Sequence, residues 1–184
     1  MNKIKAILIP GNGGGTPQDN WFPYLERELP KIGVMVINKQ FPDSVLAREE
    51  FWLPFIKKIG ADENTILIGH SSGAIATLRF AEKNKIFGSV LVGAYYTDLG
   101  NENEKKSGYF NSPWDWKSIK NNQSWIIQFA SIDDPLIPIE EPRLLHKNLH
   151  TDYYEYQNQK HFGYELTPKL EFPEIVESLK HKIK

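Results

Sequence analysis

The chain has 184 residues, a formal net charge of -1 and a hydrophobic content of 40%. This length is typical of one domain, and we expect a single domain over residues 1–184. The near-neutral charge gives no electrostatic basis for binding nucleic acid or an anionic membrane, so we expect neither partner. The chain contains no cysteine, which excludes disulfides, cysteine-ligated zinc and a thiol nucleophile.

The first ten residues hold a short apolar run that stops at Pro10 and does not have the pattern of a signal peptide. No segment reaches the apolar length that a transmembrane helix needs. From these two observations we expect a soluble, cytoplasmic protein.

Short apolar runs recur along the chain and predict buried strands. Most are continuous and rich in aliphatic and β-branched residues, which is typical of strands covered on both faces. They occupy residues 5–9, 34–38, 65–68, 89–92 and 125–129. The more polar segment TDYYEY, at 151–156, predicts a sixth strand that lies nearer an edge of the sheet.

Segments with apolar residues at helical spacing separate these strands. They cover residues 21–29, 45–59, 74–83, 139–149 and 170–183, and we expect Asp43 or Ser44 to cap the second of them. Strands that alternate with helices indicate an α/β fold, here a mostly parallel sheet of about six strands with helices on both faces.

One long segment, 95–116, interrupts this alternation. It is polar in its middle and aromatic at its ends, and a segment of this length in a compact domain is often a lid or a binding loop. A plain surface excursion is the alternative. We favour the lid, because four large rings are rarely exposed together without a function: Tyr109, Phe110, Trp114 and Trp116.

The segment GHSSG, at 69–73, matches the pattern G-x-S-x-G with Ser71 at its centre. This pattern places a serine on a sharp turn between a strand and a helix, where its hydroxyl is exposed above the sheet. A predicted strand precedes the segment and a predicted helix follows it, which is the context that the pattern requires. We therefore predict that Ser71 is a nucleophile, with a glycine-rich loop without chemistry as the alternative.

A serine nucleophile needs a base, and the base needs an orienting acid. In open α/β sheets of this kind the chain order is serine, acid, histidine. Asp133 and Asp134 compete for the acid, since both follow the strand at 125–129. We favour Asp134, because the proline after it biases its backbone toward an extended conformation. The base is His161, in the loop between the last strand and the last helix.

The other histidines fit the role of the base less well. His70 neighbours the nucleophile and should point elsewhere from the turn. His146 and His150 share a predicted helix face, but no carboxylate cluster joins them, so we predict no metal site. His181 lies in a lysine-rich tail.

Backbone N–H groups are expected to form the oxyanion hole. One belongs to Ser72, at the start of the helix after the turn, and the other to Asn12 or Gly13 in the glycine-rich loop PGNGGGT. A phosphate-binding function of this loop is disfavoured, because it lacks the lysine of a P-loop and the spacing G-x-G-x-x-G. We therefore expect no nucleotide and no other cofactor.

Seven sequence blocks lie in one order along nearly the whole chain: PGNGGG, REEFWLPF, IGHSSGAIA, DLGNENE, SGYF, PWDW and DDP. Together they resemble the retinoblastoma-binding protein 9 family, which consists of small serine hydrolases with an α/β-hydrolase fold and includes bacterial relatives. The resemblance implies a Ser-Asp-His triad, which falls on Ser71, Asp134 and His161. It also implies activity toward small activated esters and, for some members, toward amides or amino-acid esters.

The mammalian member of that family is named for a Leu-x-Cys-x-Glu segment that is said to bind retinoblastoma protein. A chain without cysteine cannot contain this segment, so we expect no binding of retinoblastoma protein.

These observations predict a serine hydrolase that cleaves small carboxylic esters, or amides, through an acyl-enzyme on Ser71. Its partner is then a small acyl substrate. Trp52, Trp114 and Trp116 are candidate walls of the substrate pocket, with core packing as the alternative. A non-catalytic binding or regulatory protein on the same scaffold is the second hypothesis.

Overall fold

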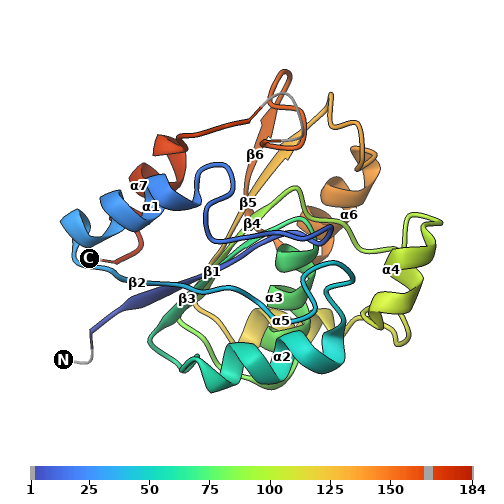
Figure 1. Cartoon of the computed structure of the whole chain (residues 1–184), viewed down its shortest axis with the longest axis horizontal. Coiled ribbons are helices and arrows are strands. Elements are labelled where there is room, and N and C mark those ends of the chain that lie inside the picture. The colour runs from blue at the N-terminus through green and yellow to red at the C-terminus, as the bar shows by residue number, and fades with distance from the viewer. Residues whose placement is uncertain (1–2, 164–167, 184) are drawn as a thin grey trace.

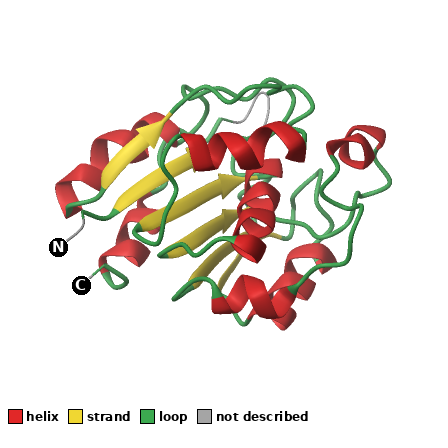
Figure 2. Cartoon of the chain, turned by 90° about the horizontal axis from the view of Figure 1, so that it is seen from below, coloured by secondary structure: helices red, strands yellow, loops and turns green. Residues whose placement is uncertain are grey.

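The computed structural model describes residues 3–163 and 168–183 of the chain. Within these residues six parallel strands form one sheet, in the order β2-β1-β3-β4-β5-β6. Figure 2 shows the strands side by side, with helices packed around the sheet. The strands are β1 (Lys5–Ile9), β2 (Met35–Asn38), β3 (Thr65–His70), β4 (Gly88–Val92), β5 (Ile126–Ser131) and β6 (Asp152–Tyr156). The predicted α/β fold with about six parallel strands is confirmed.

The central strands are the most deeply buried part of the sheet. All residues of β3, β4 and β5 are buried, because helices cover both of their faces. The outer strands β2 and β6 are partly exposed. The sequence segment 151–156 therefore does form an edge strand, as its polar composition predicts.

Helices cover the sheet on both faces (Figure 1). α1 (Phe22–Glu28) and α7 (Pro173–Lys180) pack on one face, together with the short 3-10 helix η1 (Leu29–Ile32) that follows α1. α2 (Glu49–Lys58), α3 (Ser72–Lys83), α5 (Trp116–Asn121) and α6 (Glu140–Leu149) pack on the other face. In the described part of the chain, no helix has the length and apolar character needed to cross a membrane.

The start of α2 differs from the prediction. The helix begins at Glu49 rather than at residue 45, because Asp43 and Ala47 adopt left-handed backbone conformations with φ of 49° and 53°. Asp43 does not cap the helix. Its carboxylate instead accepts hydrogen bonds from the backbone N–H and the guanidinium of Arg48, which fastens the turn before the helix.

The segment 95–116 contains the short helix α4 (Glu102–Ser107), which periodicity did not predict and which lies away from the sheet (Figure 1). The end of the segment is fixed to α3 by the buried side chain of Arg79. This guanidinium donates to the backbone oxygens of Tyr109 (2.7 Å) and Ser112 (2.6 Å) and lies 3.7 Å from the centroid of the Trp114 ring. The second half of the segment is therefore packed against the body of the protein.

Candidate active site

Ser71 occupies a strained turn between β3 and α3. Its backbone has φ 54° and ψ -122°, a conformation that non-glycine residues rarely adopt. The positions two residues before and after Ser71 have no room for a side chain. A Cβ on Gly69 would overlap the backbone of Gly73, and a Cβ on Gly73 would overlap the carbonyl oxygens of Ile9 and Pro10. The turn can form only because both positions lack a side chain.

His161 and Asp134 form a buried pair at the carboxyl end of the sheet. The Nδ1–H of His161 donates to Oδ2 of Asp134 at 2.7 Å, and both side chains are at most 5% exposed. The other carboxylate oxygen of Asp134 accepts the backbone N–H groups of Leu136 and Ile137. These two bonds hold the carboxylate still, so Asp134 fixes the orientation of the His161 ring.

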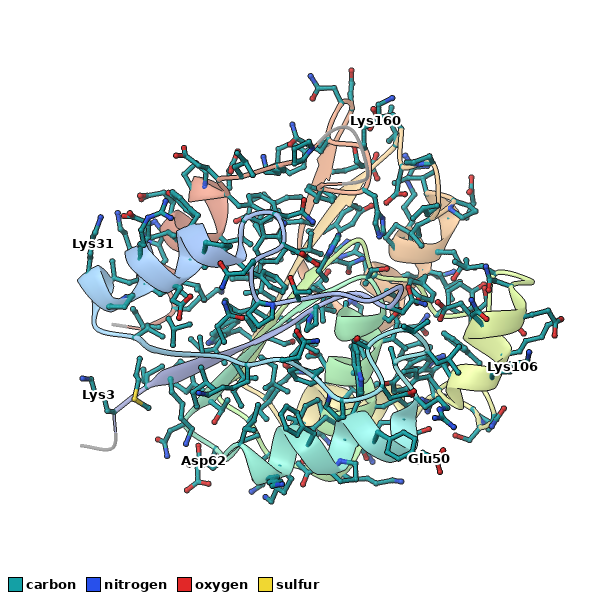
Figure 3. All side chains as sticks on the ribbon, in the orientation of Figure 1. Lys3, Lys31, Glu50, Asp62, Lys106 and Lys160 are labelled. Carbon is teal, nitrogen blue, oxygen red and sulfur yellow. The ribbon has the colours of Figure 1, made fainter. Side chains whose placement is uncertain are left out.

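Asp133, the competing acid, has a different set of contacts. Its Oδ1 accepts from the Ser131 hydroxyl (2.6 Å) and from the backbone N–H of Lys160 (3.0 Å). Asp133 therefore ties down the loop that carries His161, while Asp134 contacts the imidazole itself. In Figure 3, the label of Lys160 marks this loop at the top of the molecule.

Three consecutive carbonyl oxygens of that loop accept hydrogen bonds from side chains elsewhere in the fold. The oxygen of His161 accepts from His70 (2.7 Å), that of Phe162 from Trp21 (3.0 Å) and that of Gly163 from Asn20 (3.4 Å). The two residues that flank His161 need this support. Both have left-handed backbone conformations, with φ of 51° at Lys160 and 56° at Phe162.

His70 is a neutral hydrogen-bond donor in this arrangement. A carbonyl oxygen can only accept, so Nε2 of His70 carries the proton and Nδ1 does not. Burial, with the nearby His161 as a smaller cause, lowers the pKa of His70 to about 3. The centroids of the two imidazole rings are 4.8 Å apart, so a neutral His70 places no positive charge beside the His161 ring. His70 therefore points elsewhere from the turn, as expected, but toward the His161 loop, and its ring lines the same cavity as Ser71.

The predicted oxyanion donors differ in their availability. Ser72 is the first residue of α3, where a backbone N–H has no acceptor within the helix, and its hydroxyl is turned away toward Tyr95. The prediction that Gly13 is a possible oxyanion donor is wrong, because its N–H donates to the backbone oxygen of Val45 at 2.9 Å and is not available to a substrate. Of the two predicted donors in the loop after β1, Asn12 is the one that remains.

The side chain of Glu104 reaches this side of the site from α4. Its carboxylate accepts from the Asn12 amide (2.6 Å) and from the Tyr95 hydroxyl (2.7 Å), and Tyr95 in turn contacts the Ser72 hydroxyl (3.1 Å). Glu104 is buried, and this burial raises the pKa of its carboxyl group. The network therefore connects α4 to both remaining oxyanion candidates.

Two cavities meet at Ser71. The first, of about 410 Å³, is also lined by His161, His70 and Asn20. The second, of about 300 Å³, is also lined by Glu104 and by apolar side chains. No hydrogen bond joins the Ser71 hydroxyl to His161 among the described residues, and such bonds are often formed only when a substrate is bound.

The prediction that Trp52, Trp114 and Trp116 form walls of the substrate pocket is wrong. Trp52 is completely buried between α2 and the sheet, and its indole N–H donates to the backbone oxygen of Pro42. Trp114 and Trp116 stack on each other with centroids 5.4 Å apart, and Trp114 also covers Arg79. None of the three lines either cavity at Ser71, because their rings serve core packing and the attachment of the segment 95–116.

Sequence reasoning missed three residues of this region: His70, Tyr95 and Glu104. Their roles depend on contacts between separate segments of the chain, such as His70 with the His161 carbonyl and Glu104 with Asn12, which no local pattern specifies. Within residues 3–163 and 168–183 the structure contains no group of three or more histidines and carboxylates that could hold a metal ion.

Comparisons with known proteins show which family the chain belongs to. The model of the Serine hydrolase family matches residues 6–180. The rat protein "Serine hydrolase RBBP9" is 42% identical over 179 residues, which cover 96% of this chain and 94% of that protein.

Two solved structures show the same fold. The ydeN gene product of B. subtilis has a TM-score of 0.85 at 24% identity, with 98% of each chain covered. The ferulic acid complex of Est1E from Butyrivibrio proteoclasticus has a TM-score of 0.75 at 13% identity and covers 98% of this chain and 88% of that chain. With the family model spanning most of the sequence, the chain belongs to the Serine hydrolase family.

Proposed function

We propose that this hydrolase cleaves small carboxylic esters, and more slowly amides, through an acyl-enzyme on Ser71. The observation that carries the proposal is the buried hydrogen bond between His161 and Asp134, beside a serine held in a strained turn. A serine hydroxyl is a weak nucleophile unless a base with a fixed orientation removes its proton. Ser71 and His161 line one cavity, which a substrate carbonyl can enter.

In the first half of the reaction, the Ser71 oxygen attacks the carbonyl carbon while Nε2 of His161 takes the hydroxyl proton. Asp134 accepts from Nδ1–H and stabilises the imidazolium that forms. The negative charge on the carbonyl oxygen is met by the N–H groups of Ser72 and Asn12. When the intermediate collapses, His161 gives its proton to the leaving oxygen, and the acyl group stays on Ser71.

In the second half, water takes the place of the leaving alcohol. His161 removes a proton from the water as its oxygen attacks the acyl-enzyme, and it then returns a proton to the Ser71 oxygen. The carboxylic acid is released and the enzyme is regenerated. Neither half requires a metal or an organic cofactor.

The test is reaction of the purified protein with a fluorophosphonate, followed by peptide mapping, together with hydrolysis of p-nitrophenyl acetate. We expect a single adduct on Ser71 and none on the adjacent Ser72. Ser71→Ala should lose labelling and about 10³-fold or more of the turnover. Ser118→Ala, at a partly exposed serine on α5 that lines neither cavity, should keep both activities.

Wild-type protein that is folded but neither labelled nor active would contradict the proposal and favour a binding protein on this scaffold. A Ser71→Ala variant with undiminished turnover would exclude Ser71 as the nucleophile. Thermal unfolding of each variant shows whether a loss of activity comes from loss of the fold.

A further inference from the structure

Of the two cavities at Ser71, only one is lined by His161. The cavity of about 410 Å³, named here the His161 cavity, is lined by the imidazole, by Asp19 and by Asn20. The cavity of about 300 Å³, named here the α4 cavity, lies against Glu104 and does not include His161 in its lining. Ser71 lines both cavities. A substrate whose carbonyl carbon lies at the Ser71 hydroxyl oxygen can therefore extend one of its two substituents into each cavity.

The chemistry decides which substituent goes where. The leaving oxygen must receive a proton from His161, so it must lie within hydrogen-bond reach of that ring. The alcohol part of the substrate therefore occupies the His161 cavity, and the acyl part extends to the opposite side of the carbonyl carbon. On this basis, which rests on the proposed function, we infer that the α4 cavity is the acyl-binding site and accepts short, uncharged aliphatic acyl groups.

The walls of the α4 cavity define this class of acyl group. Val45, Leu99 and Ile137 give it an apolar side, to which Leu136 adds at the boundary with the His161 cavity. The remaining wall is polar and is formed by Asn12, Tyr95, Asn101, Asn103 and Glu104. The apolar side favours an aliphatic acyl chain over a polar one. Val45 and Leu136 are 62% and 43% exposed, so they form the rim where a chain enters. A volume of about 300 Å³ is at the lower end of the range for ligand pockets, which favours a small acyl group.

Glu104 adds a charge to one wall of this cavity. Both of its oxygens accept hydrogen bonds, from the Asn12 amide and the Tyr95 hydroxyl, which stabilise the ionised carboxylate, and neither partner carries a positive charge that would cancel it. An acyl group that ends in a carboxylate would meet this side chain as a like charge, and the low-dielectric surroundings strengthen the repulsion. The α4 cavity therefore discriminates against dicarboxylic half-esters. It also gives the segment 95–116 a function: α4 from that segment forms a wall of the acyl site.

The experiment uses two ester series with the full-length protein. The acyl series keeps p-nitrophenol and varies the acid from acetate through butyrate and octanoate to the half-ester of glutarate. The alcohol series keeps acetate and varies the alcohol from methyl through benzyl to naphthyl. Val45→Trp fills the rim of the α4 cavity at an exposed position, and Phe51→Trp adds similar bulk to an exposed apolar residue that lines neither cavity.

We expect Val45→Trp to lower the ratio of kcat/KM for butyrate over acetate by about tenfold, because one or two methylenes are worth that much in an apolar pocket. The ratios within the alcohol series should stay unchanged, and Phe51→Trp should change neither series. Glu104→Gln, which keeps the shape and removes the charge, should raise the ratio of glutarate over butyrate by about fivefold or more.

Two outcomes would overturn the inference while leaving the hydrolase intact. The first is a Val45→Trp variant that changes the alcohol series and leaves the acyl series as in the wild type, because the two cavities would then have the opposite roles. The second is a Glu104→Gln variant with the wild-type preference between glutarate and butyrate. If wild-type protein instead shows no turnover and no phosphonate adduct, the proposed function fails and the inference fails with it. Thermal unfolding identifies any variant that has lost its fold.

Discussion

Replacing His70 tests whether the loop that carries His161 is held in place from β3. His70→Leu removes the donor to the His161 carbonyl oxygen and leaves an apolar side chain of similar size in a buried position. His70→Gln is the matched control, because its side-chain amide places an N–H donor at about the position of Nε2. The Ser71 turn and the bond between His161 and Asp134 are not themselves altered by either change.

The expected effect follows from the contacts of the loop. A buried carbonyl that loses its partner costs about 1–3 kcal/mol. The left-handed conformations of Lys160 and Phe162 each add a cost of about 1–2 kcal/mol, and the hydrogen bonds to the loop must offset it. If the loop escapes part of the cost by leaving the productive position, kcat/KM should fall by about 5- to 150-fold, since about 1.4 kcal/mol corresponds to a factor of ten.

The assay is kcat/KM for the hydrolysis of p-nitrophenyl acetate, with urea unfolding of each variant beside it. We expect His70→Leu to lower kcat/KM, because the loop that carries His161 loses a hydrogen bond that holds it in the productive position. His70→Gln should restore most of the activity. A folded His70→Leu protein with the kcat/KM of the wild type would refute the reasoning. A loss of activity that matches the unfolded fraction would mean only that less protein is folded.

Other residues lead to equally specific expectations. The pKa of His70 is about 3 in the folded protein and 6.5 in its ordinary state, so between these pH values only the unfolded chain binds the proton. The free energy of unfolding should therefore decrease as the pH is lowered from about 6.5 to 3, by up to about 1.4 kcal/mol per pH unit from this residue. Urea unfolding of His70→Gln at a series of pH values should show a smaller dependence on pH. Asp134→Asn should lower kcat by about 10³- to 10⁴-fold, whereas Asp133→Asn, which changes only the loop anchor, should stay within about tenfold of the wild type in the same ester assay. Gly73→Ala should cost more than about 3 kcal/mol in urea unfolding, because its methyl group meets the backbone of β1 and the following loop, which cannot move aside; a stability near that of the wild type would contradict the packing of the turn. Arg79→Leu should leave the carbonyl oxygens of Tyr109 and Ser112 without a donor, with an expected cost of about 2–5 kcal/mol and faster proteolysis within 95–116; unchanged cleavage rates would show that the segment is held by other contacts.

The segment 95–116 combines a fixed part and a part near the active site. Its second half is attached to α3 through Arg79, whereas α4 in its first half reaches the site through Glu104. The segment that the sequence predicts to be a lid thus contributes, through Glu104 of α4, a wall of the α4 cavity.

Local patterns in the sequence were sufficient to predict the sheet and the turn at Ser71. Both depend on short-range order: an apolar run of four to six residues suits a buried strand, and glycines two residues before and after a serine permit a turn in which a Cβ would overlap the backbone. The chain order serine, acid, histidine also placed Asp134 and His161 at the carboxyl ends of neighbouring strands, where the structure joins them by a hydrogen bond.

Only the tertiary structure decided the remaining contacts, because they join separate segments of the chain, in two cases about 90 positions apart. The bond from His70 to the His161 carbonyl spans 91 residues, and that from Asn12 to Glu104 spans 92. No local pattern encodes which backbone group a side chain will meet when loops from separate strands converge. The same reason explains the errors: an N–H of Gly13 is committed to Val45, and the tryptophans pack into the body of the protein, because the neighbours of each were set by the packing of distant segments and not by their own sequence context.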